Sequence, residues 1–94
     1  METTQQLGGN IELKGFNALD GGTMTIVRKI VGNFARKLSD GKPGFEKLLI
    51  SLEEDGMVKA EVMISGTTHV GESKNDNLFF ALNEATTQAE AKIA

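Results

Sequence analysis

Six cationic side chains lie close together in the middle of the chain and could bind the phosphates of a nucleic acid. Between residues 28 and 47 the acidic residues are only Asp40 and Glu46, although the whole chain of 94 residues carries a net charge of -3. A local cluster of Lys and Arg is the electrostatic signature of a phosphate-binding surface. The candidate RNA-binding residues are Arg28, Lys29, Arg36, Lys37, Lys42 and Lys47.

The same cations also fit a solvated helix face whose charges pair with neighbouring carboxylates. Surface ion pairs of this kind contribute little to stability. The absence of any acidic residue between Asp20 and Asp40 favours phosphate binding. The acidic total and the lack of a long basic tail favour the solvated face, so the sequence leaves both interpretations open.

Other residues that could do chemistry have simpler structural interpretations. Gly21–Thr23 precedes a predicted helix, where backbone N–H groups can hold an anion, but the spacing matches no known phosphate-binding motif. We expect a turn with a helix cap there. His69 is the single histidine and has no carboxylate partner at helical spacing, so we expect an ordinary strand residue. Glu53–Asp55 is expected to form a solvated turn that discourages strand pairing at a sheet edge.

The sequence favours a binding protein over an enzyme. It contains no Cys and no Gly-x-Ser-x-Gly turn, and any Ser-His-Asp grouping would have to use the single histidine. We therefore expect no catalytic residues, no metal and no cofactor. The start of the chain lacks the features of a signal peptide, and its apolar runs are far shorter than the roughly 20 residues that span a bilayer. The sequence thus predicts a small, soluble, cytoplasmic protein without a membrane partner.

The elements that position these residues follow from the periodicity of apolar side chains. Residues 1–9 are polar and are predicted to form a flexible tail before a single domain, residues 10–94. Alternation over residues 11–16 predicts a strand that places Phe16 on the same face as Glu12 and Lys14. Asp20 or Thr23 can cap a helix over residues 24–38, whose apolar stripe faces a sheet and whose opposite face is basic.

The second half of the chain predicts three strands and a helix. The strands cover residues 45–52, 57–65 and, more weakly, 67–73, and the segment Glu54–Gly56 forms a hairpin turn between the first two. Asn75–Asn77 supplies caps for a helix over residues 77–93, on which Phe80 points to the polar side. The order β-α-β-β-β-α predicts an α+β two-layer sandwich, with both helices on one face of a four-stranded, mostly antiparallel sheet.

Two segments resemble the ribosome hibernation-promoting factor family. In GESKNDNLFFALNEATTQAEAKI a strand leads through an acidic-polar turn into a helix with Leu, aromatic residues and Ala-rich turns. IELKGF and the helix through VGNFARKL resemble the family's first strand and first helix. The resemblance spans Ile11 to Ile93 and implies a β-α-β-β-β-α domain that binds the small ribosomal subunit in its decoding channel, without catalysis.

The resemblance carries only part of the family's basic surface into this chain. Family members usually have many basic residues on both helices, whereas here the last helix has only Lys92 near its end. The implied contacts with rRNA phosphates are Arg28, Lys29, Arg36 and Lys37. Double-stranded-RNA-binding domains share the two-layer layout, but the Lys-rich start of their final helix is missing.

The leading hypothesis is a non-enzymatic binding module that contacts RNA, and specifically ribosomal RNA or the ribosome, through its first helix. The alternative is a protein-interaction or homodimerising module without a nucleic-acid role. It rests on apolar residues predicted to be exposed on the polar side of the last helix or on the sheet face away from the helices. These protein-interface candidates are Phe16, Leu49, Met63 and Phe80.

Overall fold

Five strands and two helices make up the part of the chain that the structure, a computed structural model, describes. It describes residues 4–8, 10–16 and 19–93, and the side chains of residues 10–16 and 19–93. The elements are β1 (Thr4–Gly8), β2 (Ile11–Lys14), α1 (Gly21–Gly41), β3 (Phe45–Leu52), β4 (Met57–Ile64), β5 (Thr67–Lys74) and α2 (Leu78–Ala91).

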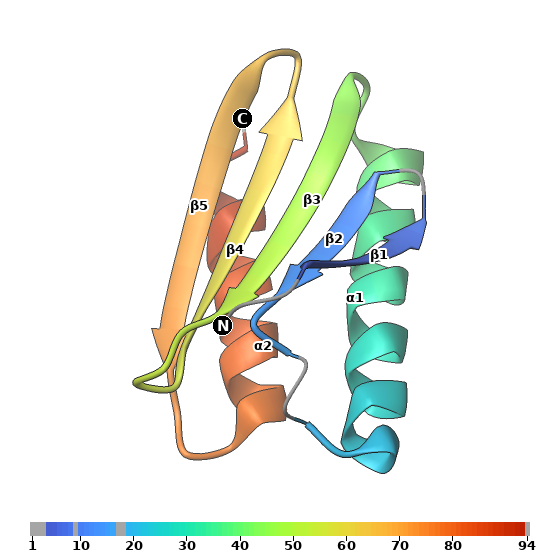
Figure 1. Cartoon of the computed structure of the whole chain (residues 1–94). Helices are drawn as coiled ribbons and strands as arrows, with labels where there is room; N and C mark the ends of the chain where they lie inside the picture. The colour runs from blue at the N-terminus through green and yellow to red at the C-terminus, as the bar shows by residue number, and fades with distance from the viewer. Residues whose placement is uncertain (1–3, 9, 17–18, 94) are drawn as a thin grey trace.

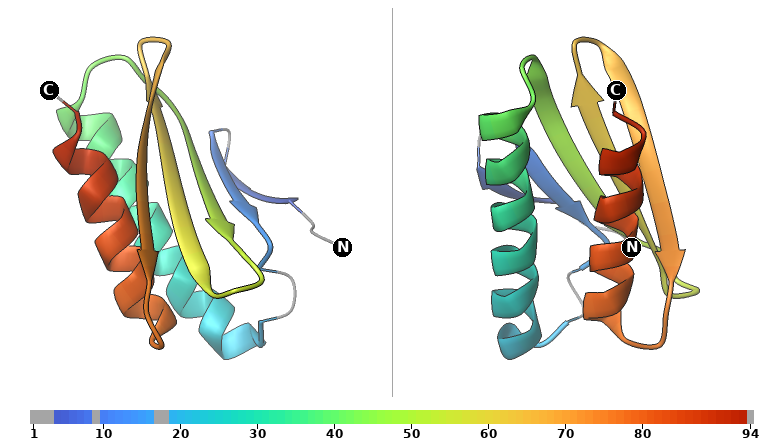
Figure 2. Two further views of the ribbon diagram at one scale, coloured as in Figure 1. Left: turned by 90° about the vertical axis from the view of Figure 1, so that its left-hand side faces the viewer. Right: turned by 180° about the vertical axis from the view of Figure 1, so that it is seen from behind.

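The strands form one sheet in the order β1-β2-β3-β4-β5. β2 and β3 are parallel, as a connection through helix α1 requires, and the other neighbours are antiparallel. Both helices lie on the same face of the sheet, side by side and running in the same direction (Figures 1 and 2). This arrangement confirms the predicted two-layer α+β sandwich and the order β-α-β-β-β-α, including β5, the weakest of the predicted strands.

β1 lies within the segment that was predicted to be a tail and adds a fifth strand to the predicted four. Its backbone pairs antiparallel with β2, with Thr4 opposite Lys14 and Gln6 opposite Glu12. The sequence TQQLG has little alternation of apolar and polar residues. Hydrophobic periodicity therefore gives no signal for a short edge strand that is held by backbone pairing. Residues 1–3 and 9 of the predicted tail lie outside the described residues.

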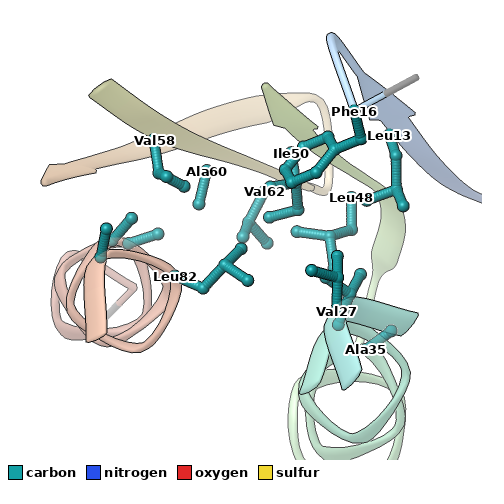
Figure 3. Packing of buried hydrophobic residues seen from close by; sticks show 14 of the residues in the cluster. Leu13, Phe16, Val27, Ala35, Leu48, Ile50, Val58, Ala60, Val62 and Leu82 are labelled. Carbon is teal, nitrogen blue, oxygen red and sulfur yellow. The ribbon is translucent and has the colours of Figure 1, made fainter. Parts of the chain in front are cut away.

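The core lies between the sheet and the two helices. Alternate residues of β3 and β4 point toward the helices, and these side chains are fully buried: Leu48, Ile50, Val58, Ala60 and Val62. Figure 3 shows them facing Val27 and Ala35 of α1 and Leu82 of α2. The period of two in the strands and of about 3.6 in the helices thus brings the predicted apolar stripes together.

Phe16 is part of this core, and its predicted position on the outer face is wrong. The side chain is 0% exposed. β2 ends at Lys14, and Gly15 has a φ of +83°, in the left-handed region that side chains other than glycine rarely adopt. The strand alternation is therefore broken at Gly15, and Phe16 enters the core instead of following Glu12 and Lys14 to the outer face.

A two-residue turn, Ser65–Gly66, joins β4 and β5. Both residues have positive φ, 49° for Ser65 and 81° for Gly66, as in the type I′ turns that match the twist of paired strands. The carboxylate of Glu46 accepts a hydrogen bond from the Gly66 N–H at 2.6 Å. This turn sets the β4–β5 register, in which Val62 lies opposite His69 and Ala60 opposite Gly71.

Two side chains near the C-terminal end of α2 contact the outer edge of β5. The Glu72 N–H donates to Oε1 of Gln88 at 3.3 Å, and the Lys92 ammonium donates to the backbone carbonyl of Val70. Outward-facing peptide groups of an edge strand otherwise invite pairing with another chain. Side chains of α2 and of its C-cap residue thus occupy part of the β5 edge.

Removal of the cap of α2 should cost measurable stability. Oδ1 of Asn77 accepts hydrogen bonds from the N–H groups of Phe79 at 2.9 Å and Phe80 at 3.3 Å, whereas Asp20, at the N-cap of α1, makes no side-chain cap bond. Asn77→Ala should lower the free energy of unfolding by about 1 kcal/mol. Asp20→Ala, the matched control, should cost less than about 0.5 kcal/mol. Equal losses for the two variants in urea unfolding would contradict the assigned cap.

Candidate nucleic-acid interface on α1

Helix α1 presents its cations to solvent because its apolar residues face the sheet. Met24, Val27, Val31, Ala35 and Leu38 are buried. The helix is amphipathic, and its exposed cations are Arg28, Lys29, Arg36 and Lys37. Residues 28 and 36 are about 12 Å apart along the helix axis, at 1.5 Å per residue. The predicted basic face therefore exists as an exposed strip along α1.

Ion pairs divide the cations of the described residues into two groups. The paired group joins Lys37 to Glu90 at 3.1 Å, Lys47 to Glu12 at 3.1 Å, Lys59 to Glu61 at 3.7 Å and Lys74 to Asp55 at 3.9 Å. Within the described ranges, no carboxylate lies at ion-pair distance from Arg28, Lys29, Arg36 or Lys42. Lys92, the C-cap residue of α2, also has no carboxylate at ion-pair distance, but its ammonium donates to the backbone carbonyl of Val70. Among the described residues, the cations with neither kind of partner thus gather on α1 and at its end.

The last two RNA-binding candidates, Lys42 and Lys47, lie on different sides of the molecule. Lys42 is the C-cap residue of α1, and its N–H donates to the Leu38 carbonyl at 2.8 Å, so it extends the basic strip at the helix end. Lys47 belongs to β3 and lies on the sheet face opposite the helices, where it pairs with Glu12. The sheet therefore separates Lys47 from the other five candidates, although it is close to them in the sequence.

A shallow groove of about 310 Å³ runs between α1 and α2, beside the basic strip. The Lys37–Glu90 ion pair joins the two helices at this groove. The lining residues are Ile30, Asn33, Phe34 and Lys37 of α1 and Asn83, Thr86, Thr87 and Glu90 of α2. Sequence reasoning missed the groove because it requires two helices that are far apart in the chain to lie side by side.

The other chemically suggestive residues do not form a site. His69 is a residue of β5, as predicted, and Gly21–Thr23 forms the first turn of α1. Glu53–Asp55 lies in the exposed turn between β3 and β4. In the part of the chain that the structure describes, no three His, Asp or Glu side chains are grouped as metal ligands.

The protein-interface candidates separate onto two surfaces. Phe80, in the first turn of α2, is 62% exposed, as predicted for the polar side of that helix. Leu49 and Met63 lie on the sheet face away from the helices, as predicted, but they are half-buried and not exposed. With Lys47, Glu61 and Thr68 they line a hollow of about 200 Å³. Phe16, in the core, contributes to neither surface.

Comparison with known proteins adds no family assignment. The chain matches no protein-family model, and no curated protein is significantly similar to it. Of the helices that the structure describes, none has the length and apolar character needed to cross a membrane. The functional argument therefore rests on the chain's own residues.

Proposed function

We propose that the protein is a cytoplasmic, non-enzymatic RNA-binding module that contacts phosphates through the exposed strip of α1. The observation that carries this proposal is the exposure of Arg28, Lys29 and Arg36 without a carboxylate partner among the described residues. A cation that already has a carboxylate partner must exchange it for the phosphate, which reduces the net gain on binding. An unpaired cation on the surface exchanges only water and counterions.

Ribosomal RNA is the proposed target. From β2 onward, the order of elements agrees with the order implied by the resemblance to the ribosome hibernation-promoting factor family. Three of the four residues that the resemblance assigns to rRNA contacts are the unpaired cations of α1, and Lys37, the fourth, pairs with Glu90. The groove beside the strip adds amide and hydroxyl side chains, which can bond to sugar and phosphate oxygens.

The test is the salt dependence of binding to a labelled ribosomal-RNA hairpin, measured by fluorescence anisotropy. Neutralisation of three phosphates should give a slope of log K against log salt of about -2 to -3. The variant Arg28→Ala/Lys29→Ala/Arg36→Ala should lose this slope and most of the affinity at low salt. Circular dichroism should show an unchanged fold, because the three side chains are exposed.

A matched control removes three positive charges elsewhere. Lys47→Ala/Lys59→Ala/Lys74→Ala changes the net charge by the same amount, but these lysines are paired with carboxylates. This variant should bind RNA with nearly wild-type affinity and slope. An equal loss in both triple variants would show a general charge effect in place of an α1 site. Absence of wild-type binding at low salt would also overturn the proposal.

A protein-interaction role is the second candidate function. It is favoured by the half-buried side chains of Leu49 and Met63 on a sheet face that neither helix covers. Isolated apolar side chains on a surface need no explanation, but two that share a hollow mark a candidate contact.

A further inference from the structure

Neither of the two helices that the structure describes covers one face of the sheet, which we call the open face. It consists of the side chains of β2 to β5 that point away from the helices, and Figure 2 shows both helices on the other side. Near its centre, Leu49 and Met63 line the hollow together with charged and polar residues. An apolar centre with a polar rim is the usual anatomy of a protein–protein contact.

The strand register places five charges of the open face in two neighbouring rows: the first carries two glutamates, and the second carries two lysines and Glu72. The first row runs across β2 to β5 as Glu12, Leu49, Glu61 and Val70, and the second row runs as Lys14, Ser51, Lys59 and Glu72. The two rows are two positions apart along each strand, which is a distance of about 7 Å. On β2 and on β4 a glutamate in the first row is therefore followed by a lysine in the second.

This pattern is complementary to itself under a two-fold rotation. An axis that crosses the strands midway between the rows lays the first row of one copy over the second row of another. Glu61 then faces Lys59 of the second copy, and Glu12 faces Lys14 of the second copy. Met63 faces Met57 of the second copy beside these pairs. In a two-fold dimer each such contact occurs twice, because both copies use the same patch.

We propose that the protein forms a homodimer through the open face, with the glutamate row of each copy on the lysine row of the other. A second copy fits this face better than a polyanion does, because the glutamates that lie beside its lysines repel a polyanion. The α1 strip, on the opposite side of the molecule, remains accessible in the dimer. The dimer is independent of the RNA proposal and adds a second surface to the protein.

The size of the open face indicates a weak dimer. The eight-residue strands β3, β4 and β5 are about 26 Å long and the four-residue β2 is about 13 Å long, so at about 4.8 Å per strand the open face has roughly 440 Å² of sheet per copy. A standard stable interface buries about 800 Å² per partner. β1 turns away from the helices at the β2 flank (Figure 2) and bounds the contact there. We expect a dissociation constant in the micromolar range.

The test reverses single charges on the open face and then restores their complementarity in a double variant. Sedimentation velocity over a range of protein concentrations measures the dimerisation of each variant. The wild type should change from monomer to dimer across the micromolar range. K59E and E61K alone should each weaken the dimer about tenfold or more, because each places like charges opposite each other. The double variant K59E/E61K should restore it, since the two reversed charges again face opposite partners.

Controls separate the dimer from the fold and from RNA binding. Leu49→Ser should give a folded monomer by circular dichroism, because Leu49 is outside the buried core, and it should still bind RNA. The α1 triple variant should dimerise like the wild type. A monomeric wild type at high concentration would overturn the proposal. So would a dimer that is insensitive to the single reversals, or a double variant that stays as weak as the single ones.

Discussion

Gly71→Ala is expected to lower the free energy of unfolding by about 3 kcal/mol, at the upper end of the usual cost of overpacking. A Cβ atom at Gly71 would lie 2.0 Å from the carbonyl oxygen of Ala85 and 2.5 Å from the backbone nitrogen of Ala89. These are backbone atoms of α2, which cannot rotate away as a side chain can. The whole helix must therefore shift from β5, and its core contacts through Leu82 loosen.

Gly32→Ala is the matched control for this prediction. Gly32 lies within α1, and no atom outside the helix's own backbone is within 4 Å of the position that its Cβ would take. Alanine there should stabilise the protein by up to about 1 kcal/mol, through its higher helix propensity. Urea unfolding monitored by circular dichroism measures both variants. Wild-type stability in Gly71→Ala would show that α2 does not approach β5 as closely as described.

Phe16→Ala is expected to cost about 3 to 5 kcal/mol, the usual loss when a buried Phe is truncated. The side chain is 0% exposed and belongs to the core between the sheet and the helices. Domains have a total stability of only about 5 to 15 kcal/mol, so the variant should lose a large fraction of its free energy of unfolding. Thermal unfolding should show a large decrease in Tm.

Phe80→Ala provides the same chemical change at a position that is 62% exposed. It should change the stability by less than about 0.5 kcal/mol. The pair of variants also tests the break in alternation at Gly15, because the predicted strand pattern would leave Phe16 on the outer face. Similar small effects for Phe16→Ala and Phe80→Ala would favour that pattern over the structure.

The fold was largely predictable because most of its elements carry a strong periodic signal. The α1 stripe through Val27, Val31 and Leu38 has the spacing of a helix that packs on a sheet, and the structure buries all three side chains. The strand Met57–Ile64 alternates along its whole length, as does its burial. Phe16 was misplaced because alternation is a local rule, and a single left-handed glycine changes the direction of the next side chain.

The candidate site was predictable only as far as one helix defines it. Arg28, Lys29 and Arg36 are on one exposed strip because helical spacing places them there. Lys47 is five residues beyond Lys42, yet the period of two in β3 places it on the far side of the sheet. The partner of Lys37 could not be anticipated, since Glu90 is 53 residues away in the chain. Such pairing depends on how α1 and α2 pack together, and the periodicity of each helix does not predict this.

The cover that Gln88 and Lys92 place on β5 has a consequence for folding of the chain. β5 can pair with β4 through a two-residue turn, whereas its cover forms only when α2 docks on the sheet. Until α2 docks, the outward peptide groups of β5 are open to strands of other partly folded chains, which can aggregate there. Variants that loosen α2 should therefore promote aggregation as well as lower the stability.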